Sequence, residues 1–291
     1  MARVKKHIEP QAELQKEMQE MISGSYIDWG KSKEQVWMDM EKKMKPSQTS
    51  GTKVILLPWV KVAMAAAFAL LIGIAAFLQL YTKNVGIPAG QHSQIYLPDQ
   101  SLVKLNAQSS LSYKPLLWKF SRKVKFEGEA YFEVEQGKKF EVISNSGKTA
   151  VLGTSFNIYS RNNDYQITCV SGKVKVTASE NNREAILLPG QKAALNPSGT
   201  FDVQSGVNKE QSLSWLNNIL SFTSVSLLKV FEEIGRQYGI LVIIPGDLDN
   251  MYTGTFRRDT SIENALNLVC KPFNLSFTRK SNDEYIISRN K

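Results

Sequence analysis

Residues 62–82 read VAMAAAFALLIGIAAFLQLYT and contain no charged side chain. A helix of this length rises about 30 Å, enough to cross the hydrocarbon layer of a membrane. A buried core helix rarely keeps more than about 14 unbroken apolar residues. Trp59 and Tyr81 flank the run in the manner of an interfacial belt. We therefore predict a transmembrane helix over residues 59–82. It is expected to be an anchor, because a cleavable signal peptide would begin near residue 1.

Lysines next to the run predict its orientation. The 20 residues before the run, 42–61, contain five lysines: Lys42, Lys43, Lys45, Lys53 and Lys61. Residues 82–103, which follow it, contain only one lysine close to the run, Lys83. Positive charge stays on the cytoplasmic side, so the amino terminus is expected in the cytoplasm and residues 83–291 outside it. Disulfides are permitted there, yet Cys169 and Cys270 are expected to be two separate buried thiols.

Composition narrows the class of protein. The chain has 291 residues, a net charge of +9 and 42% hydrophobic residues, which exclude a wholly disordered chain and favour about two domains. Two cysteines and two histidines match no metal-ligand spacing, so no metal and no cofactor is expected. The densest basic patch, residues 122–125, alternates with apolar residues as one face of a strand does, so direct nucleic-acid binding is not expected.

The segment before the anchor contains two predicted amphipathic helices. Residues 11–22 form the first, and a second begins after Ser32, where Gln35 completes a capping box. Pro46 ends the second helix, and residues 46–53 are typical of a flexible tether. The apolar faces include Leu14, Met18, Met21, Val36, Trp37 and Met40.

About 45 residues cannot build much of a core. Methionine-rich faces suit a groove in a partner protein, so we expect these faces to bind one. A self-packed helical hairpin and a position on the membrane surface are the alternatives. Glutamates along the first helix disfavour anionic lipid.

Residues 93–205 have the pattern of an all-β domain, with roughly ten short strands in a sandwich-like or coiled antiparallel stack. The clearest runs are 101–106, 123–128, 130–135, 140–144, 155–160, 164–170 and 172–178. Glu127, Glu129, Glu133 and Glu135 follow a period of two, which is typical of a solvated or salt-bridged sheet face. No nucleophile, base and orienting group come together, and His92 falls in a predicted linker, so we do not expect an enzyme.

After a polar link at 204–212, residues 213–291 predict a small α+β domain. A strand near 220–222, a helix around 227–234 and a strand at 240–244 form one βαβ unit. Eight positions match a second unit at an offset of 35 residues, which predicts an internal duplication. Ser226 and Ser261 stand at the two expected helix N-caps, and residues 285–288 form a last strand.

Several motifs resemble the FecR family of anti-sigma factors. They are Leu97-Pro98-Asp99-Gln100-Ser101 with Leu105-Asn106-Ala107, Gly128-Glu129-Ala130-Tyr131-Phe132-Glu133-Val134, Val151-Leu152-Gly153-Thr154-Ser155-Phe156-Asn157, and Leu188-Pro189-Gly190-Gln191. The motif positions taken as structural or signalling candidates are Asp99, Asn106, Gly128, Glu129, Tyr131, Phe132, Val134, Leu152, Gly153, Thr154, Phe156, Asn157, Pro189 and Gly190. Gln100 stands where the family usually has glycine. Residues 215–288 resemble the domain that follows in Bacteroidetes-type members, which is similar to the secretin and TonB amino-terminal (STN) fold.

This resemblance implies a single-pass regulator of the bacterial inner membrane. Its cytoplasmic helices would hold an extracytoplasmic-function (ECF) sigma factor, and its periplasmic part would sense the signalling domain of a TonB-dependent outer-membrane transporter. Family members are commonly processed by periplasmic and intramembrane proteases, and some cytoplasmic fragments assist their sigma factor. The cytoplasmic segment here is shorter than in many relatives.

The expected organisation has four parts: 1–58, a sigma-binding segment with tether; 59–82, the transmembrane helix; 83–205, the all-β FecR-like domain; and 213–291, the STN-like domain. The alternative function is a membrane-tethered periplasmic scaffold or assembly protein for an outer-membrane complex.

Overall fold

A computed structural model describes residues 11–24, 30–44, 58–244, 246 and 248–290. The chain divides into two units, residues 1–66 and 67–291. The predicted tether at 46–53 lies outside the described residues.

The two amphipathic helices are present as α1 (Gln11–Ser23) and α2 (Lys33–Met44). The capping box before α2 is also confirmed. The backbone N–H of Ser32 donates to Oε1 of Gln35 at 3.1 Å, and the N–H of Gln35 donates to Oγ of Ser32 at 3.3 Å. Both bonds satisfy donors that the first helical turn leaves free.

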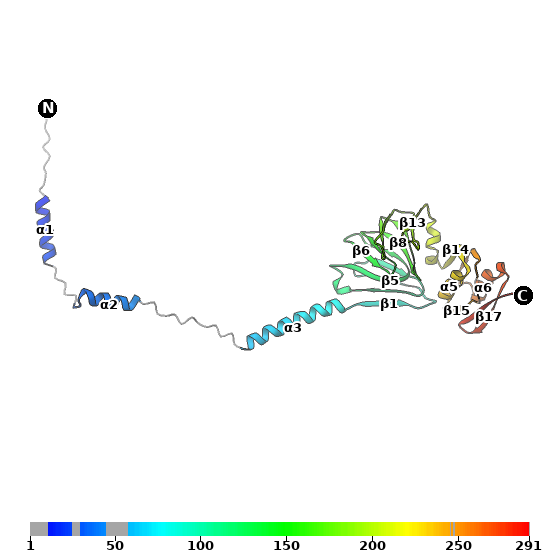
Figure 1. The fold of residues 1–291 in the computed structure, drawn as a ribbon, viewed down its shortest axis with the longest axis horizontal. Coiled ribbons are helices and arrows are strands. Elements are labelled where there is room, and N and C mark those ends of the chain that lie inside the picture. The colour runs from blue at the N-terminus through cyan, green and yellow to red at the C-terminus, as the bar shows by residue number, and fades with distance from the viewer. Residues whose placement is uncertain (1–10, 25–29, 45–57, 245, 247, 291) are drawn as a thin grey trace, which may run out of the picture. The chain divides into compact units, whose positions relative to one another are not determined.

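The apolar run forms α3 (Pro58–Leu80), a helix of 23 residues. Its residues 59–80 are long and apolar enough to cross a membrane, and within the described part of the chain no other helix is. A core helix of a soluble protein would be covered by other side chains, whereas the apolar window of α3 is not buried at all. The helix passes directly into the first strand of the next domain (Figure 1).

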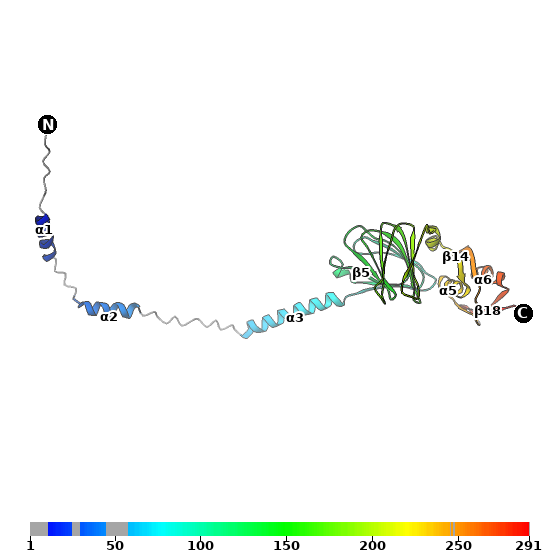
Figure 2. The same cartoon turned by 45° about the horizontal axis from the view of Figure 1, so that its top comes forward.

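A β sandwich follows the helix (Figures 1 and 2). Its strands are β1 (Lys83–Ile87), β2 (Ser93–Tyr96), β3 (Leu102–Leu105), β4 (Ser109–Tyr113), β5 (Arg122–Glu133), β6 (Phe140–Ile143), β7 (Gly147–Val151), β8 (Ser155–Arg161), β9 (Asp164–Ser171), β10 (Val174–Ala178), β11 (Glu184–Leu187), β12 (Gln191–Leu195) and β13 (Phe201–Ser205), with a 3₁₀ turn η1 (Pro115–Leu117) before β5. The all-β prediction agrees with this architecture. The first strand, β1, lies before the predicted start of the strands.

The two sheets share β5. One sheet has the order β1-β4-β5-β6-β7-β10-β11 and the other β2-β3-β5-β8-β9-β12-β13. Every pair is antiparallel except β5 with β6, so the expectation of an antiparallel stack needs this correction. The prediction of two separate strands at 123–128 and 130–135 is also wrong, because both runs belong to the single strand β5. Gly128, with a φ of 120°, lets one strand bend from the first sheet into the second without ending its hydrogen-bond ladder.

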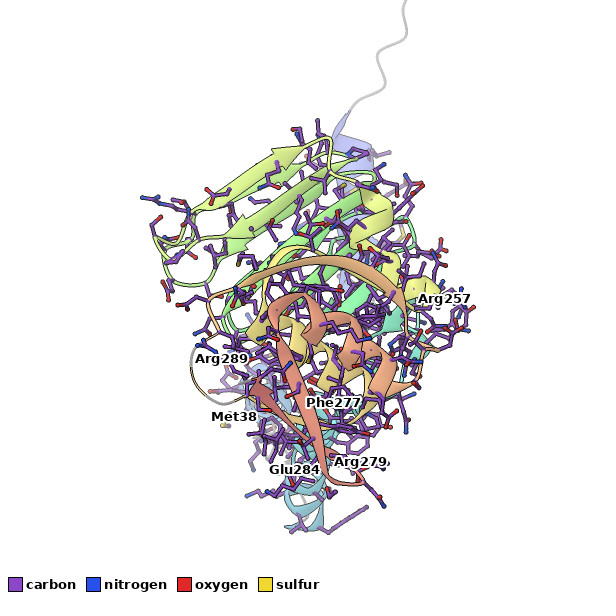
Figure 3. All side chains as sticks on the ribbon, turned by 90° about the vertical axis from the view of Figure 1, so that its right-hand side faces the viewer. Met38, Arg257, Phe277, Arg279, Glu284 and Arg289 are labelled. Atoms are coloured by element: carbon purple, nitrogen blue, oxygen red, sulfur yellow. The ribbon has the colours of Figure 1, made fainter. Side chains whose placement is uncertain are left out.

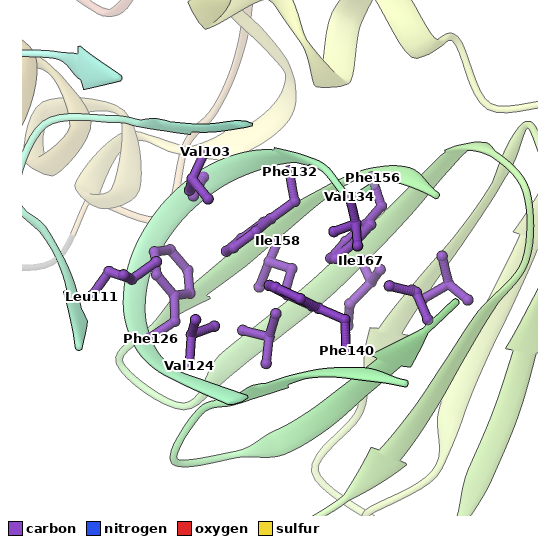
Figure 4. Close-up of a cluster of buried hydrophobic side chains, with 14 of the residues drawn as sticks. Val103, Leu111, Val124, Phe126, Phe132, Val134, Phe140, Phe156, Ile158 and Ile167 are labelled. Atoms are coloured by element: carbon purple, nitrogen blue, oxygen red, sulfur yellow. The ribbon is translucent and has the colours of Figure 1, made fainter. Parts of the chain in front are cut away.

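The inward faces of both sheets form one core, rich in aromatic side chains. Val124 and Phe126 come from the first half of β5, and Phe132 from the second half, as Figure 4 shows. Phe132 stacks on Phe156 of β8 with ring centroids 5.2 Å apart. Alternation along β5 is what places these rings inside and the lysines between them outside.

The carboxyl-terminal domain follows the short helix α4 (Lys209–Ser212) and begins with the turn η2 (Ser214–Asn217). It contains β14 (Ile219–Ser226), α5 (Leu227–Tyr238), β15 (Leu241–Ile243), β16 (Met251–Arg257), α6 (Ile262–Cys270), η3 (Lys271–Phe273), β17 (Leu275–Ser281) and β18 (Glu284–Arg289). β14 pairs with β16, and β15-β18-β17 form a second sheet with β15 parallel to β18. Figure 3 shows the β17–β18 hairpin, with Phe277 and Arg279 on one strand and Glu284 on the other.

Strand, helix and strand do follow one another twice, but the strands on either side of each helix lie in different sheets. Each unit is therefore split, unlike a βαβ unit with two parallel strands in one sheet. Ser226 and Ser261 are the N-cap residues, as expected. Only the side chain of Ser261 caps, accepting from the N–H of Asn264 at 3.3 Å. Cys169 and Cys270 are free and buried, as predicted.

Candidate functional sites

The first candidate site is the pair of apolar faces on α1 and α2. The six candidate side chains, Leu14, Met18, Met21, Val36, Trp37 and Met40, are between 37% and 72% exposed. Trp37 alone leaves about two thirds of its large apolar surface in contact with water. A self-packed hairpin would bury part of these apolar faces, but within residues 14–24 and 30–44 no side chain is buried. These helices present faces that a partner could cover.

The second candidate site lies where the β sandwich meets the carboxyl-terminal domain. Two motif asparagines lie there on either side of the carboxylate of a third motif residue, Glu129. The amide Nδ2 of Asn106 donates to Glu129 Oε2 at 2.8 Å, and Nδ2 of Asn157 donates to Oε1 of the same residue at 3.0 Å. The sequence separates these three residues, but adjoining strands bring them together, since β5 pairs with both β3 and β8.

The carboxyl-terminal domain binds the same two asparagines from the other side. Nε1 of Trp215 donates to Asn157 Oδ1 at 3.2 Å, and Nε2 of Gln237 donates to Asn106 Oδ1 at 2.7 Å. Each asparagine thus uses its amide on Glu129 and its carbonyl on the second domain. We call these five residues the junction cluster. It is a specific polar contact, because each amide is placed to give and to accept in fixed directions.

His92 and Glu233 extend the junction cluster. A ring nitrogen of His92 lies 2.9 Å from Oε1 of Gln237, and the imidazole meets the indole of Trp215 edge to face at 5.7 Å. Glu233 accepts from Gln237 at 2.7 Å and from Arg236 at 2.8 Å. The segment holding His92, predicted as a linker, is therefore part of the domain contact.

Burial changes the acid–base properties of this site. Desolvation, with the nearby charge of Glu233 adding to it, raises the pKa of Glu129 to about 7, although the two asparagine amides and Arg161 act against the rise. Desolvation also lowers the pKa of His92. Glu129 is half-buried and its carboxylate accepts hydrogen bonds from two asparagines, so the expectation of a solvated or salt-bridged sheet face does not hold for it.

A cleft of about 680 Å³ runs along the junction and is lined by residues of both domains. Its charged lining is of both signs, with Lys192, Lys229 and Arg236 beside Glu129 and Glu233. Lys229 of α5 crosses it and forms an ion pair with Asp164 of β9 at 2.9 Å. Within the described residues no group of three or more His, Cys, Asp or Glu side chains could hold a metal ion.

The remaining motif residues shape the sandwich. Asp99 accepts from Nε of Arg122 at 2.6 Å, and that guanidinium also donates to the carbonyls of Lys138 and Glu135. Tyr131, Phe132, Val134, Thr154 and Phe156 are buried, whereas Leu152 and Pro189 are exposed.

Two of the motif glycines hold close backbone contacts. A Cβ on Gly153 would lie 2.8 Å from Cα of Gln136, which explains the absence of a side chain there. Gly190 has a φ of 83°, and its carbonyl accepts from the N–H of Val207 at 3.1 Å. That turn fixes the start of the link between the domains.

Sequence patterns indicated neither Trp215, Gln237, Glu233 nor His92 as members of a site. Trp215 lies beside the polar link at 204–212, and His92 lies in a segment predicted to be a linker. An aromatic or imidazole ring at such a position is the one sequence signal that could have marked these two residues. Gln237 and Asn106 are 131 positions apart and meet only in the folded chain.

Comparison with known proteins agrees with this architecture. Residues 83–175 match the family model described as FecR protein, and residues 219–287 match the model described as FecR, C-terminal. A solved structure of a "putative anti-sigma factor" from Parabacteroides distasonis ATCC 8503 is 25% identical, with a TM-score of 0.66 over 72% of this chain and 100% of that one. A second solved structure with the same description and source is 24% identical, with a TM-score of 0.65 and the same coverage. No curated protein sequence matches the chain.

In this chain one candidate membrane span precedes a β sandwich and a small α+β domain. This architecture and the similarity to solved structures place the chain in a regulatory class of protein, the anti-sigma factors. The chain belongs to the FecR family of these proteins.

Proposed function

We propose that this chain is a single-pass anti-sigma factor of the bacterial inner membrane. It would hold an ECF sigma factor with α1 and α2 and receive a signal from a TonB-dependent outer-membrane transporter in the periplasm. The observation that carries the proposal is the pair of exposed apolar faces on α1 and α2, which precede an apolar helix of spanning length in a chain of this family. Membership of the family supports a sigma factor as the partner.

Sigma binding would bury the apolar faces of α1 and α2. Trp37 would contribute most, because large aromatic side chains dominate protein interfaces. We expect Trp37→Ala to weaken binding of the purified full chain to its sigma factor by about tenfold or more. Met38 is the matched control: it is 60% exposed on the same helix but points away from the face formed by Val36, Trp37 and Met40.

The measurement is isothermal titration calorimetry with the full chain in nanodiscs and, one at a time, the purified ECF sigma factors of its source organism. Met38→Ala should change the affinity by less than about twofold. Equal affinities for Trp37→Ala and the parent chain would remove this face from the interface. Absence of any binding by the parent chain would overturn the sigma-binding proposal itself and favour the scaffold function.

The membrane orientation follows from lysine placement, with the amino terminus in the cytoplasm and residues 83–291 in the periplasm. Two reporter fusions at the carboxyl terminus test it. Alkaline phosphatase should be active when fused after residue 291, and a fluorescent protein exported through the same route should be dark there. The opposite pattern would reverse the proposed topology.

The carboxyl-terminal domain would act as the receiver, with an STN-like fold and an internally duplicated strand–helix–strand unit. Periplasmic and intramembrane proteases would then act on the anchored chain. Removal of residues 213–291 should leave sigma capture intact but uncouple transcription from the transporter's substrate in a reporter strain. A normal substrate response in that strain would show that the domain is not needed for the relay.

A further inference from the structure

The connection between β4 and β5 is a compact turn with apolar side chains on its outside. Residues 114–121 form it, and the N–H groups of Leu117, Phe120 and Ser121 all bond to carbonyls within the turn. Phe120 is 85% exposed and Leu116 is 44% exposed. Two apolar side chains thus stand on the outside of one short, hydrogen-bonded turn.

The turn is held in place from inside. Trp118 lies in the middle of it but points inward, where its ring packs edge to face on Tyr113 at 5.5 Å and on Phe140 at 5.9 Å. Trp118 is 4% exposed. With Trp118 fixed in the core, Leu116 and Phe120 are directed outward by the fold and not by chance.

Strand pairing places this turn beside the end of α3. β1 begins three residues after α3 ends, and Lys83 at its start is paired with Tyr113 at the end of β4. Because the two strands are antiparallel, the chain beyond Tyr113 runs back toward α3. Nζ of Lys114 indeed lies 3.4 Å from Oε1 of Gln79, in the last turn of α3.

Charge around the turn fits a lipid surface. Lys114 and Lys119 belong to the turn, and Lys83 lies opposite Tyr113, which precedes it. None of the three lysines is in an ion pair with any described residue. Lysines that flank apolar side chains are the usual composition of segments at the headgroup level, where the amine reaches phosphate and the stem stays apolar.

We infer that the 114–121 turn is a second membrane contact: Leu116 and Phe120 enter the leaflet from which β1 emerges, and Lys114 and Lys119 bind lipid phosphates. This rests on the proposal that α3 spans the membrane. If α3 spans, its last turn lies at the headgroup boundary, and the turn beside Gln79 lies at the same depth. A bilayer, not a protein groove, is therefore what meets these side chains.

The contact would set the orientation of the periplasmic part. β1 starts at the membrane end with Lys83, and shortly after its other end the N–H of Gly90 donates to the carbonyl of Arg236 at 2.8 Å. One short strand thus joins the bilayer surface to the second domain. With both α3 and the turn fixed, the sandwich cannot rotate freely about its tether, and the carboxyl-terminal domain is held facing away from the membrane.

Site-directed spin labelling of the full chain tests this. Phe120→Cys, Leu116→Cys, Leu71→Cys and Leu228→Cys carry a nitroxide in nanodiscs of phosphatidylcholine and phosphatidylglycerol, and collisions with oxygen and with a water-soluble nickel chelate are compared. Leu71 is an exposed residue in the middle of α3, and Leu228 is an exposed residue of α5. The parent chain, whose two cysteines are buried, is the background.

Labels at positions 71, 116 and 120 should favour oxygen, and the label at 228 should favour the nickel chelate. Phe120→Ser should also make the label at 116 more accessible to nickel, since losing one buried ring lowers the docked population about tenfold. Leu228→Ser should leave that label unchanged.

Three results would overturn the inference in distinguishable ways. Water-like labels at 116 and 120 with a lipid-like label at 71 would leave the span standing without a second contact. A water-like label at 71 would remove the span and the inference together. Labels at 116 and 120 shielded from both reagents would show that protein, in this sample a second copy, covers the turn.

Discussion

The indole of Trp215 in the carboxyl-terminal domain donates to the side-chain carbonyl of Asn157 in the β sandwich at 3.2 Å. The same asparagine donates to Glu129, so one buried amide links a carboxylate of the first domain to an aromatic ring of the second. The junction cluster thus couples the two domains, together with the Lys229–Asp164 ion pair and the Gly90–Arg236 hydrogen bond.

Removal of the Trp215 ring should loosen the junction. Trp215→Ala removes a side chain that is 9% exposed and leaves Asn157 Oδ1 without its donor. We expect the free energy of unfolding to fall by about 3 kcal/mol, as for large aromatic truncations. Urea denaturation followed by circular dichroism measures it. Leu228→Ala, an exposed site on the same domain, should stay within about 0.5 kcal/mol.

The raised pKa of Glu129 predicts a stability that depends on pH. The folded chain holds this proton up to a pKa of about 7, whereas the unfolded chain releases it near 4.5. Between these values the native state binds more protons, so stability is lost as pH rises from about 4.5 to 7, by up to about 3 kcal/mol. The lowered pKa of His92 has the opposite effect, because the contribution of neutral His92 to the free energy of unfolding is lost as pH falls.

Glu129→Gln should remove the Glu129 contribution because glutamine does not titrate. The parent chain gains stability from Glu129 at pH 5 that it lacks at pH 8. The free energy of unfolding at pH 5 minus that at pH 8 should therefore be smaller for the variant than for the parent chain. Glu135→Gln, at an exposed position near the end of the same strand, is the control and should keep the parent difference. An unchanged difference in Glu129→Gln would mean that another group carries the pH dependence.

Gly128 is predicted to tolerate no side chain. A Cβ there would lie 2.6 Å from Cα of Ser109, and the φ of 120° is in a region that L-residues rarely adopt. We expect Gly128→Ala to destabilise the sandwich by about 3 kcal/mol or more, through overpacking and backbone strain. In β1, Gly86 has no heavy atom within 4 Å of its Cβ position, so Gly86→Ala should be neutral or stabilising. The melting temperature should fall for Gly128→Ala and stay the same or rise for Gly86→Ala.

Gln100 is a position where glycine should improve the protein. Its φ is 69°, the left-handed region that costs a residue with a Cβ about 1 kcal/mol. Gln100→Gly should therefore raise the free energy of unfolding by about 0.5–1 kcal/mol, net of the greater freedom of glycine in the unfolded chain. Gln136→Gly, where φ is not positive, should lower it. A destabilised Gln100→Gly variant would show that the side chain makes a contact worth more than the strain.

The helices and the general class of each domain were accessible from the sequence, because they depend on local patterns. An uncharged run of 21 residues predicts α3, and the Ser32–Gln35 pair predicts the start of α2. Alternation placed Val124 and Phe126 on the inner face of a strand. In each case the informative residues lie within one helical turn or a few strand positions of one another.

Strand continuity was not accessible in the same way. Runs at 123–128 and 130–135 are one strand because Gly128 bends the backbone between two sheets, and a glycine between two alternating runs equally suggests a turn. β1 was missed because its neighbour β4, which completes its ladder, comes more than 20 residues later. Pairing energy between distant segments has no local signature.

The junction cluster depended on tertiary structure alone. The resemblance had marked Asn106, Glu129 and Asn157, yet their partners Trp215 and Gln237 belong to another domain. The charge of Glu233 in that domain adds to the desolvation that raises the pKa of Glu129. The sequence by itself determined the apolar helix of spanning length, the amphipathic helices and the two domain classes, since periodicity and composition are local. The environment of each polar group was decided by the folded chain, because desolvation is a property of everything that surrounds a side chain.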